Sequence, residues 1–138
     1  MRLLLDTHVV VWAVSSAEGL HRRVKALLTN AKNELWMSSV SAWELAMLAE
    51  RGRLQLRPDP ERWLASAVAG LGLREAPLTS AIALESGKLR VPTEDPAHRF
   101  IAATARVHEC TLVTADSALQ RIPGLRVVRC RPPKPSST

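Results

Sequence analysis

The sequence predicts an α/β fold in which helices cover both faces of a central, mainly parallel β-sheet. Short apolar runs alternate along the chain with longer segments whose apolar residues recur at helical spacing. Two of the runs, 2–6 and 110–116, are almost continuously hydrophobic, which is typical of strands buried on both faces. Helices of ten or more residues between such strands imply crossovers between parallel strands. We therefore expect a three-layer α/β/α domain.

The predicted elements follow one another from residue 2 to residue 130, and we expect residues 1–130 to form one domain. Residues 131–138, with the sequence RPPKPSST, have no large apolar side chain to bury and are predicted to form a disordered tail. Gly52 and Gly87 are expected just past the ends of helices. Strands are predicted at 2–6, 34–40, 110–116 and 124–130, and helices at 17–31, 41–52, 60–72, 78–88 and 96–108.

Composition and charge exclude some classes of protein and favour others. Hydrophobic residues make up 46% and charged residues 23% of the chain, as is ordinary for a globular protein, and the net charge of +6 favours a polyanionic partner. No run approaches the roughly 20 apolar residues that span a bilayer, and Asp6 and His8 interrupt the apolar N-terminus, so we expect neither a membrane span nor a signal peptide. Cys110 and Cys130 lack metal-type spacing and are expected to be reduced thiols. A cytoplasmic location follows from these features.

Acidic side chains follow several of the predicted strands. Asp6 ends the first strand, Asp116 ends another, and Glu44 lies in the first turn of the helix that follows a third. Because the carboxyl ends of parallel strands meet at one edge of a sheet, we expect these three acids to converge there. Asp95 and His98, at the start of a later helix, are expected beside them.

Each acid also has a simpler interpretation as a helix cap. Ser41 and Glu44 have the spacing of a capping box, in which Glu44 would bond the Ser41 backbone N–H. Asp95 followed by Pro96 has the pattern of an N-cap with proline at the first helical position. Asp116 could cap the turn that follows it. Capping explains each position separately, but it does not explain why so few aspartates are concentrated at these junctions.

Converging carboxylates predict a metal site. Carboxylates within a few ångströms repel one another, and burial increases the cost, so a cation is needed to hold them together. Oxygen ligands of this kind select Mg²⁺ or Mn²⁺. Such an ion can lower the pKa of a water molecule and stabilise charge on a phosphoryl group, while lysines and arginines hold a phosphate backbone. The predicted chemistry is metal-assisted phosphodiester hydrolysis.

Four motifs carry a resemblance to a known family. "LLLDTHVVVWAV", "SSVSAWELAML", "DPAHRFIAATA" and "LVTAD" resemble, in order and over nearly the whole chain, the PIN-domain ribonucleases. More narrowly, they resemble the VapC-type toxins of bacterial toxin–antitoxin pairs. The resemblance implies a PIN-like α/β/α fold and an endoribonuclease that depends on Mg²⁺ or Mn²⁺. It also implies a homodimer and a cognate antitoxin that inhibits the enzyme.

The resemblance assigns a role to individual residues. Asp6, Glu44 and Asp116 match the family's catalytic acids and metal ligands. Thr7 and Thr114 stand where a hydroxyl near the metal, or near its water, is common.

One position departs from the family pattern. Relatives typically have an aspartate where this chain has His98. A neutral imidazole can ligate Mn²⁺ or Zn²⁺ well and Mg²⁺ poorly. Alternatively, Asp95 could reach in, directly or through water, or His98 could be a spectator beside a weaker metal site. A catalytically impaired PIN module that binds RNA or a partner protein is therefore the competing hypothesis. Arg99, next to His98, is a candidate RNA contact.

Overall fold

The computed structural model describes residues 1–133. Residues 131–133 belong to no helix or strand, and the remainder of the predicted tail, 134–138, lies outside the described residues. None of the helices in 1–133 has the length and apolar character required to cross a membrane.

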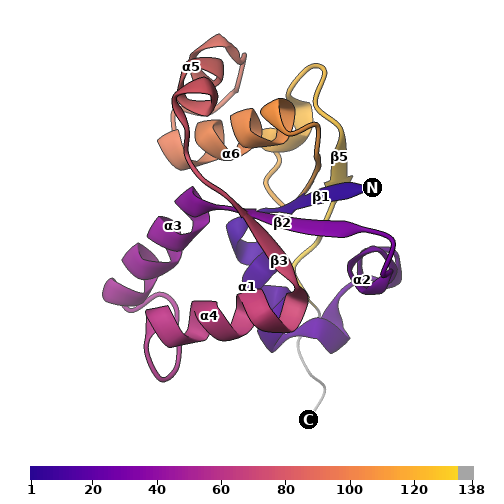
Figure 1. Ribbon diagram of the computed structural model, residues 1–138, viewed down its shortest axis with the longest axis vertical. Helices are drawn as coiled ribbons and strands as arrows, with labels where there is room; N and C mark the ends of the chain where they lie inside the picture. Colours follow the sequence, from indigo (N-terminus) through magenta and orange to yellow (C-terminus); the bar gives the residue numbers. More distant parts are fainter. Residues whose placement is uncertain (134–138) are drawn as a thin grey trace.

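A five-stranded sheet forms the middle layer, with the strand order β3-β2-β1-β4-β5 (Figure 1). Every adjacent pair is parallel, which confirms the predicted fold class. The strands are β1 Arg2–Leu5, β2 Glu34–Ser38, β3 Leu73–Ala76, β4 Thr111–Thr114 and β5 Val127–Arg129.

Helices cover both faces of this sheet. Three helices pack on one face and two on the other, while α3 lies beside the sheet near the end of β2 (Figure 1). The first face carries α1 Thr7–Ser15, α2 Arg22–Thr29 and α4 Pro60–Leu71; the second carries α5 Ser80–Lys88 and α6 Pro96–Val107; α3 is Ser39–Glu50. Two short 3₁₀ helices, η1 Ala17–Gly19 and η2 Leu119–Arg121, complete the described elements.

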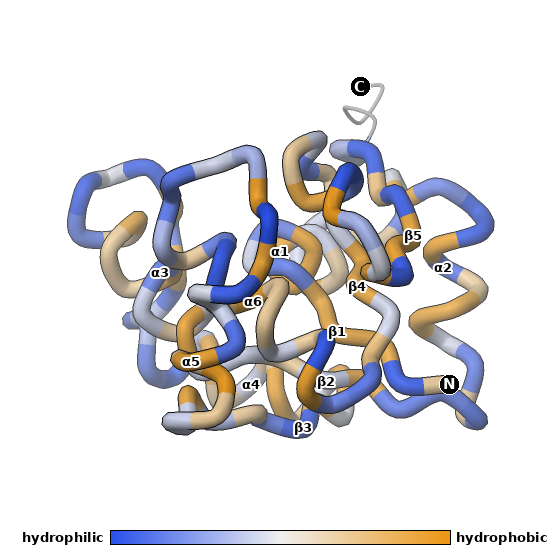
Figure 2. Tube along the Cα trace, turned by 90° about the horizontal axis from the view of Figure 1, so that it is seen from above, coloured by the Kyte–Doolittle hydropathy of each residue, from blue (hydrophilic) through white to orange (hydrophobic). Residues whose placement is uncertain are grey.

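The position of β1 in the middle of the sheet explains why its sequence is continuously apolar. Leu3 and Leu5 belong to the core beneath α1, α2 and α4, whereas Leu4 belongs to the core beneath α5 and α6. All three side chains are fully buried, because successive residues of a strand point to opposite faces. In Figure 2 the hydrophobic colour runs through β1 at the centre of the molecule, while many of the outer loops are hydrophilic.

Two elements were not predicted. Helix α1 begins directly after β1, and its run of valines resembles a strand when the sequence is considered alone. Strand β3, with the sequence LREA, places charged Arg74 and Glu75 at an exposed edge and therefore has no apolar run. Its position is set by parallel pairing with β2.

Several predicted boundaries also shift. The strand expected over 34–40 ends at Ser38, where α3 begins two residues earlier than expected. Gly87 lies inside α5 and not past its end. Gly52 does follow α3, with a φ of 71° that glycine adopts without strain.

Candidate active site

Asp6 stands where β1 passes into α1, at the carboxyl end of the central strand. Its Oδ1 caps α1 by accepting a hydrogen bond from the Thr7 backbone N–H at 2.8 Å. Its own backbone N–H donates to the Val113 carbonyl of β4 at 3.0 Å. The side chain is only 7% exposed, so its charge lies almost entirely within the protein.

Glu44 reaches the same region from the second turn of α3. The Thr7 hydroxyl donates to Glu44 Oε1 at 2.6 Å, and the Thr7 and Ser41 hydroxyls are hydrogen-bonded at 2.9 Å. The capping-box interpretation of Ser41 and Glu44 is therefore wrong. The N-cap is Ser38, whose hydroxyl accepts from the Val40 N–H, and this leaves Glu44 free to turn inward.

The electrostatics around Glu44 connect the groups at this edge. Burial raises the pKa of its carboxyl group, the Thr7 hydrogen bond lowers it, and the negative charge of Asp6 raises it. Smaller contributions come from His98, which lowers the pKa, and from Asp95, which raises it. Holding a charge at Glu44 is therefore unfavourable unless a cation compensates it.

Thr114 and Asp116 bring β4 into the site. The Thr114 hydroxyl donates to Asp6 Oδ2 at 2.5 Å and accepts from the Asp116 backbone N–H at 3.0 Å. Asp116 Oδ1 accepts from the N–H groups of Ala118 and Leu119, at 2.8 and 3.0 Å. Asp116 thus caps the turn after β4, as the alternative interpretation expected, while its second oxygen, Oδ2, lies 3.6 Å from His98 Nδ1.

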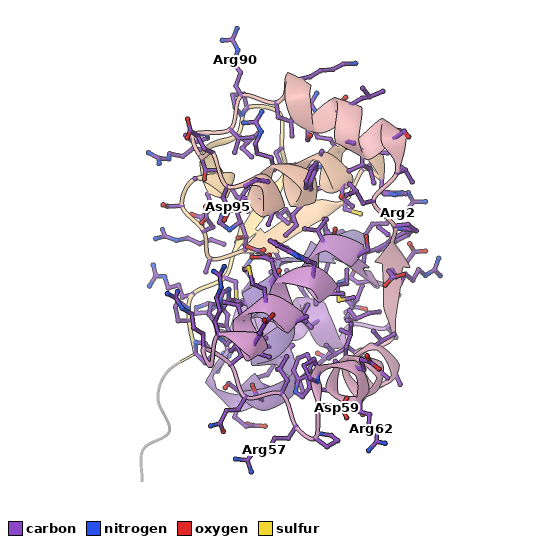
Figure 3. The ribbon with its side chains drawn as sticks, turned by 90° about the vertical axis from the view of Figure 1, so that its left-hand side faces the viewer. Arg2, Arg57, Asp59, Arg62, Arg90 and Asp95 are labelled. Carbon is purple, nitrogen blue, oxygen red and sulfur yellow. The ribbon has the colours of Figure 1, made fainter. Side chains whose placement is uncertain are left out.

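Asp95, which is labelled in Figure 3, lies at the start of α6, and His98 belongs to the first turn of the same helix. Asp95 is the N-cap, and its Oδ1 accepts from the Ala97 N–H at 3.0 Å. His98 Nδ1 lies 3.6 Å from Asp95 Oδ2 and 3.6 Å from Asp116 Oδ2. Within residues 1–133, Nδ1 is a buried nitrogen that makes no hydrogen bond.

Comparison with known proteins places this arrangement in a family. A model of the PIN domain matches residues 3–125, which is most of the chain. The chain belongs to the PIN domain family. The curated protein "Ribonuclease VapC22" from Mycobacterium tuberculosis is 36% identical over 121 residues, covering 86% of this chain and 89% of the relative.

Solved structures of related complexes share the PIN fold. VapBC2 from Rickettsia felis, bound to a promoter DNA fragment, has a chain that matches with a TM-score of 0.69 and 21% identity, covering 95% of this chain and all of that one. DNA-bound VapBC from Salmonella typhimurium matches with a TM-score of 0.67 and 25% identity, covering 94% and 98%. These similarities span nearly the whole of each chain.

The side chains of this PIN domain suit a small divalent cation. Asp6, Glu44, Asp95 and Asp116 supply carboxylate oxygens, and the unpartnered Nδ1 of His98 supplies a nitrogen. In the described part of the chain, no three His, Cys, Asp or Glu side chains are arranged closely enough to hold a metal ion as they stand. Each carboxylate has at least one oxygen held by a hydroxyl or a backbone N–H.

Two residues of this PIN domain have contacts that the sequence did not reveal. Ser41 belongs to the site through its bond to the Thr7 hydroxyl, and the only signal was its position one turn before Glu44 on the same helix. Arg99 donates from Nη2 to the carbonyls of Ser86 and Leu89, at 2.9 and 3.2 Å, where α5 ends. Its predicted contact with RNA stays a prediction.

Proposed function

We propose that this protein is a VapC-type endoribonuclease toxin that hydrolyses RNA phosphodiesters and is neutralised by a cognate antitoxin. The proposal is supported by the relative named as a ribonuclease and by the solved complexes named VapBC. The observation that carries it is the convergence of buried Asp6 and Glu44 with Asp116 at the carboxyl edge of a PIN-family sheet. Nothing in the described contacts favours a purely binding module over an enzyme.

The acids are proposed to hold Mg²⁺ or Mn²⁺. Asp6, Glu44 and Asp116 are the principal ligands, and His98 or Asp95 completes the set. A divalent cation at this position would activate a water molecule for hydrolysis and stabilise charge on the scissile phosphate. Burial, with a further contribution from the negative charge of Asp6, raises the pKa of Glu44, so a cation at this position would favour the charged carboxylate.

The two threonines act by positioning the ligands. Thr7 holds Glu44, and Thr114 holds Asp6 while it accepts a bond from the backbone of Asp116. Because both hydroxyls are buried, the carboxylates that they hold lose little further freedom when a cation binds. We assign these residues supporting roles and not direct contact with the substrate.

The rest of the molecule favours a polyanionic substrate. The chain has a net charge of +6 even though the site itself is acidic. The rest of the molecule therefore has a surplus of positively charged side chains, which can hold the RNA backbone. Arg99 remains a candidate among these cations. Residues 1–130 are proposed to act as one domain in the cytoplasm, as a homodimer, with the antitoxin bound to the same chain.

The proposal is tested by replacing the most buried aspartate of the site. Asp6→Asn keeps the size of the side chain and an oxygen that can accept the Thr7 N–H, but it removes the charge. We expect RNA cleavage in the presence of Mn²⁺ or Mg²⁺ to fall by about 100-fold or more, and growth arrest on expression to disappear. Chelation of divalent ions should have the same effect on the unmodified protein.

Asp59→Asn is the matched control. Asp59 caps α4, where asparagine is an equally good N-cap, and it lies well away from Asp95 (Figure 3). This variant should cleave RNA like the unmodified protein. Undiminished cleavage by Asp6→Asn would refute the assignment of the site, whereas RNA binding without cleavage by the unmodified protein would favour the impaired module.

A further inference from the structure

We infer that His98 Nδ1, between Asp95 and Asp116, is a metal ligand that makes this site select a transition cation such as Mn²⁺ over Mg²⁺. The inference rests on the proposed metal centre and specifies its chemistry. The evidence for it is the position of His98 Nδ1 relative to the carboxylate oxygens of Asp95 and Asp116.

The nitrogen has no hydrogen-bond partner among residues 1–133. Buried polar atoms are nearly always hydrogen-bonded, and leaving one unpaired is costly. Nδ1 is buried in the described structure and unpaired. The two carboxylate oxygens that face it, at 3.6 Å, lie beyond the distance of an N–H···O hydrogen bond, which is at most about 3.2 Å.

Those separations suit a shared cation. Bonds of about 2.0–2.2 Å from a metal to its ligands place neighbouring ligand atoms roughly 3.0–3.6 Å apart, depending on whether the geometry is octahedral or tetrahedral. Both measured separations of 3.6 Å lie at the upper end of this range. Small rotations of the side chains are enough to close the arrangement, since Asp95 is half-exposed and His98 is 22% exposed.

The carboxylates of Asp95 and Asp116 are already oriented to share a cation with His98. Asp95 and Asp116 each use Oδ1 to accept backbone N–H groups, and each turns Oδ2 toward the imidazole. The backbone bonds hold the carboxylates without using the oxygens that face His98. With the proton on Nε2, Nδ1 offers a lone pair to the same point.

A nitrogen ligand changes which ion the site prefers. Mg²⁺ is a hard cation that strongly favours oxygen ligands and gives up its water reluctantly. Transition cations accept imidazole nitrogen readily. Exchanging an aspartate for His98 also removes one negative charge, which weakens the attraction for any hard cation. We therefore expect Mn²⁺ to bind at least about tenfold more tightly than Mg²⁺.

The test combines calorimetric titration with pulsed electron paramagnetic resonance of the Mn²⁺-loaded full-length protein. In protein labelled with ¹⁵N only at histidine, we expect a hyperfine coupling between Mn²⁺ and ¹⁵N. His98→Ala and His98→Asp should both abolish this coupling. His98→Asp should also bring the affinities for Mn²⁺ and Mg²⁺ several-fold closer together, because the new ligand is an oxygen.

His21→Asn is the matched control. His21 caps α2 through Nδ1, asparagine can replace that cap, and the residue lies outside the site. It should keep both the coupling and the preference for Mn²⁺. If His98→Ala fails to fold, as judged by circular dichroism, His98→Asp and the spectrum of the unmodified protein decide the question.

The outcomes separate this inference from the proposed function. Absence of a nitrogen coupling in the unmodified protein, its survival in His98→Asp, or equal affinities for the two ions would overturn the inference. RNA cleavage without a nitrogen coupling would refute it and leave the proposed function standing. A nitrogen coupling that depends on His98, without RNA cleavage in any metal, would support the inference and refute the proposed function.

Discussion

The hydroxyl of Thr114 donates a 2.5 Å hydrogen bond to Asp6 Oδ2, joining the carboxyl ends of β4 and β1 across 108 positions of the sequence. The same hydroxyl accepts from the backbone N–H of Asp116 at 3.0 Å. One buried side chain therefore links two of the three acids that we propose as principal metal ligands. This link suggests how the site keeps its shape while its charges repel one another.

Replacing Thr114 should weaken both stability and metal binding. Thr114→Val preserves the shape but leaves Asp6 Oδ2 and the Asp116 N–H without their partner, which should lower the free energy of unfolding by about 1–3 kcal/mol. Affinity for Mn²⁺ should fall about 10-fold or more, because a carboxylate that has lost its hydrogen bond is less well positioned. Urea unfolding and calorimetric titration measure the two effects. Thr114→Ser keeps the hydroxyl and should retain most of the metal affinity; an equal loss in both variants would contradict the positioning role.

Glu44→Gln should stabilise the metal-free protein in a pH-dependent way. Burial raises the pKa of Glu44, with a further increase from Asp6, so at pH values between its ordinary and raised pKa the folded state binds more protons than the unfolded state. The free energy of unfolding therefore falls as pH rises through this window, and the penalty is complete above it. Glutamine removes the penalty and can still accept the Thr7 hydroxyl bond.

The measurement for Glu44 is urea unfolding at about pH 4 and pH 7.5, without divalent ions. We expect Glu44→Gln to be more stable than the unmodified protein at the higher pH, and this advantage to vanish at the lower one. RNA cleavage, assayed separately with Mn²⁺ or Mg²⁺ present, should be lost in Glu44→Gln. Glu75→Gln, on the exposed edge of β3, should show little change, and an advantage of Glu44→Gln that is independent of pH would count against the electrostatic explanation.

Arg99 should matter for the stability of α5. Its guanidinium donates to the carbonyls of Ser86 and Leu89, which lie at the end of that helix. Arg99→Ala should therefore lower the free energy of unfolding by about 1–2 kcal/mol, and Arg99→Lys by less. No loss of stability would show that these bonds contribute nothing.

The contact with RNA predicted for Arg99 has a separate readout. A phosphate contact contributes about one unit to the slope of log affinity against log salt concentration. Binding of RNA to an Asp6→Asn background, measured with and without Arg99→Ala, distinguishes the two roles. A reduced slope would support contact with RNA, and an unchanged slope would leave Arg99 with the role in stability alone.

The two cysteines should be nearly unreactive in the folded protein. Burial raises the pKa of Cys110 and of Cys130 to about 11, and neither forms a disulfide. At pH 7.5 the reactive thiolate is then a fraction of about one in a thousand or less. A colorimetric thiol reagent should react at least about 100-fold more slowly with the native protein than with the protein in guanidinium chloride, where both thiols titrate. Fast reaction of either thiol in the native state would contradict the burial of that side chain.

Much of the fold could be predicted because local patterns and burial agree. The run Leu3–Leu5 and the strand around Val113 are apolar on both faces, which specifies central strands of a covered sheet. Asp95 followed by Pro96 predicted the start of α6 correctly, since capping depends only on neighbouring residues. The edge strand β3 could not be predicted, because its polar residues form a strand only through pairing with β2.

The sequence by itself determined the fold class, the order of the main elements and the delivery of Asp6, Glu44 and Asp116 to one edge of the sheet. These features follow from the periodicity of the sequence, which is local, and from the general rule that strands joined by helical crossovers run parallel and end at the same edge of the sheet. Only the tertiary structure decided the partners of each side chain: Thr7 for Glu44, Thr114 for Asp6, and two carboxylates around the unpaired nitrogen of His98. Such contacts join residues that lie far apart in sequence, and no local pattern encodes which polar groups meet once the strands are paired.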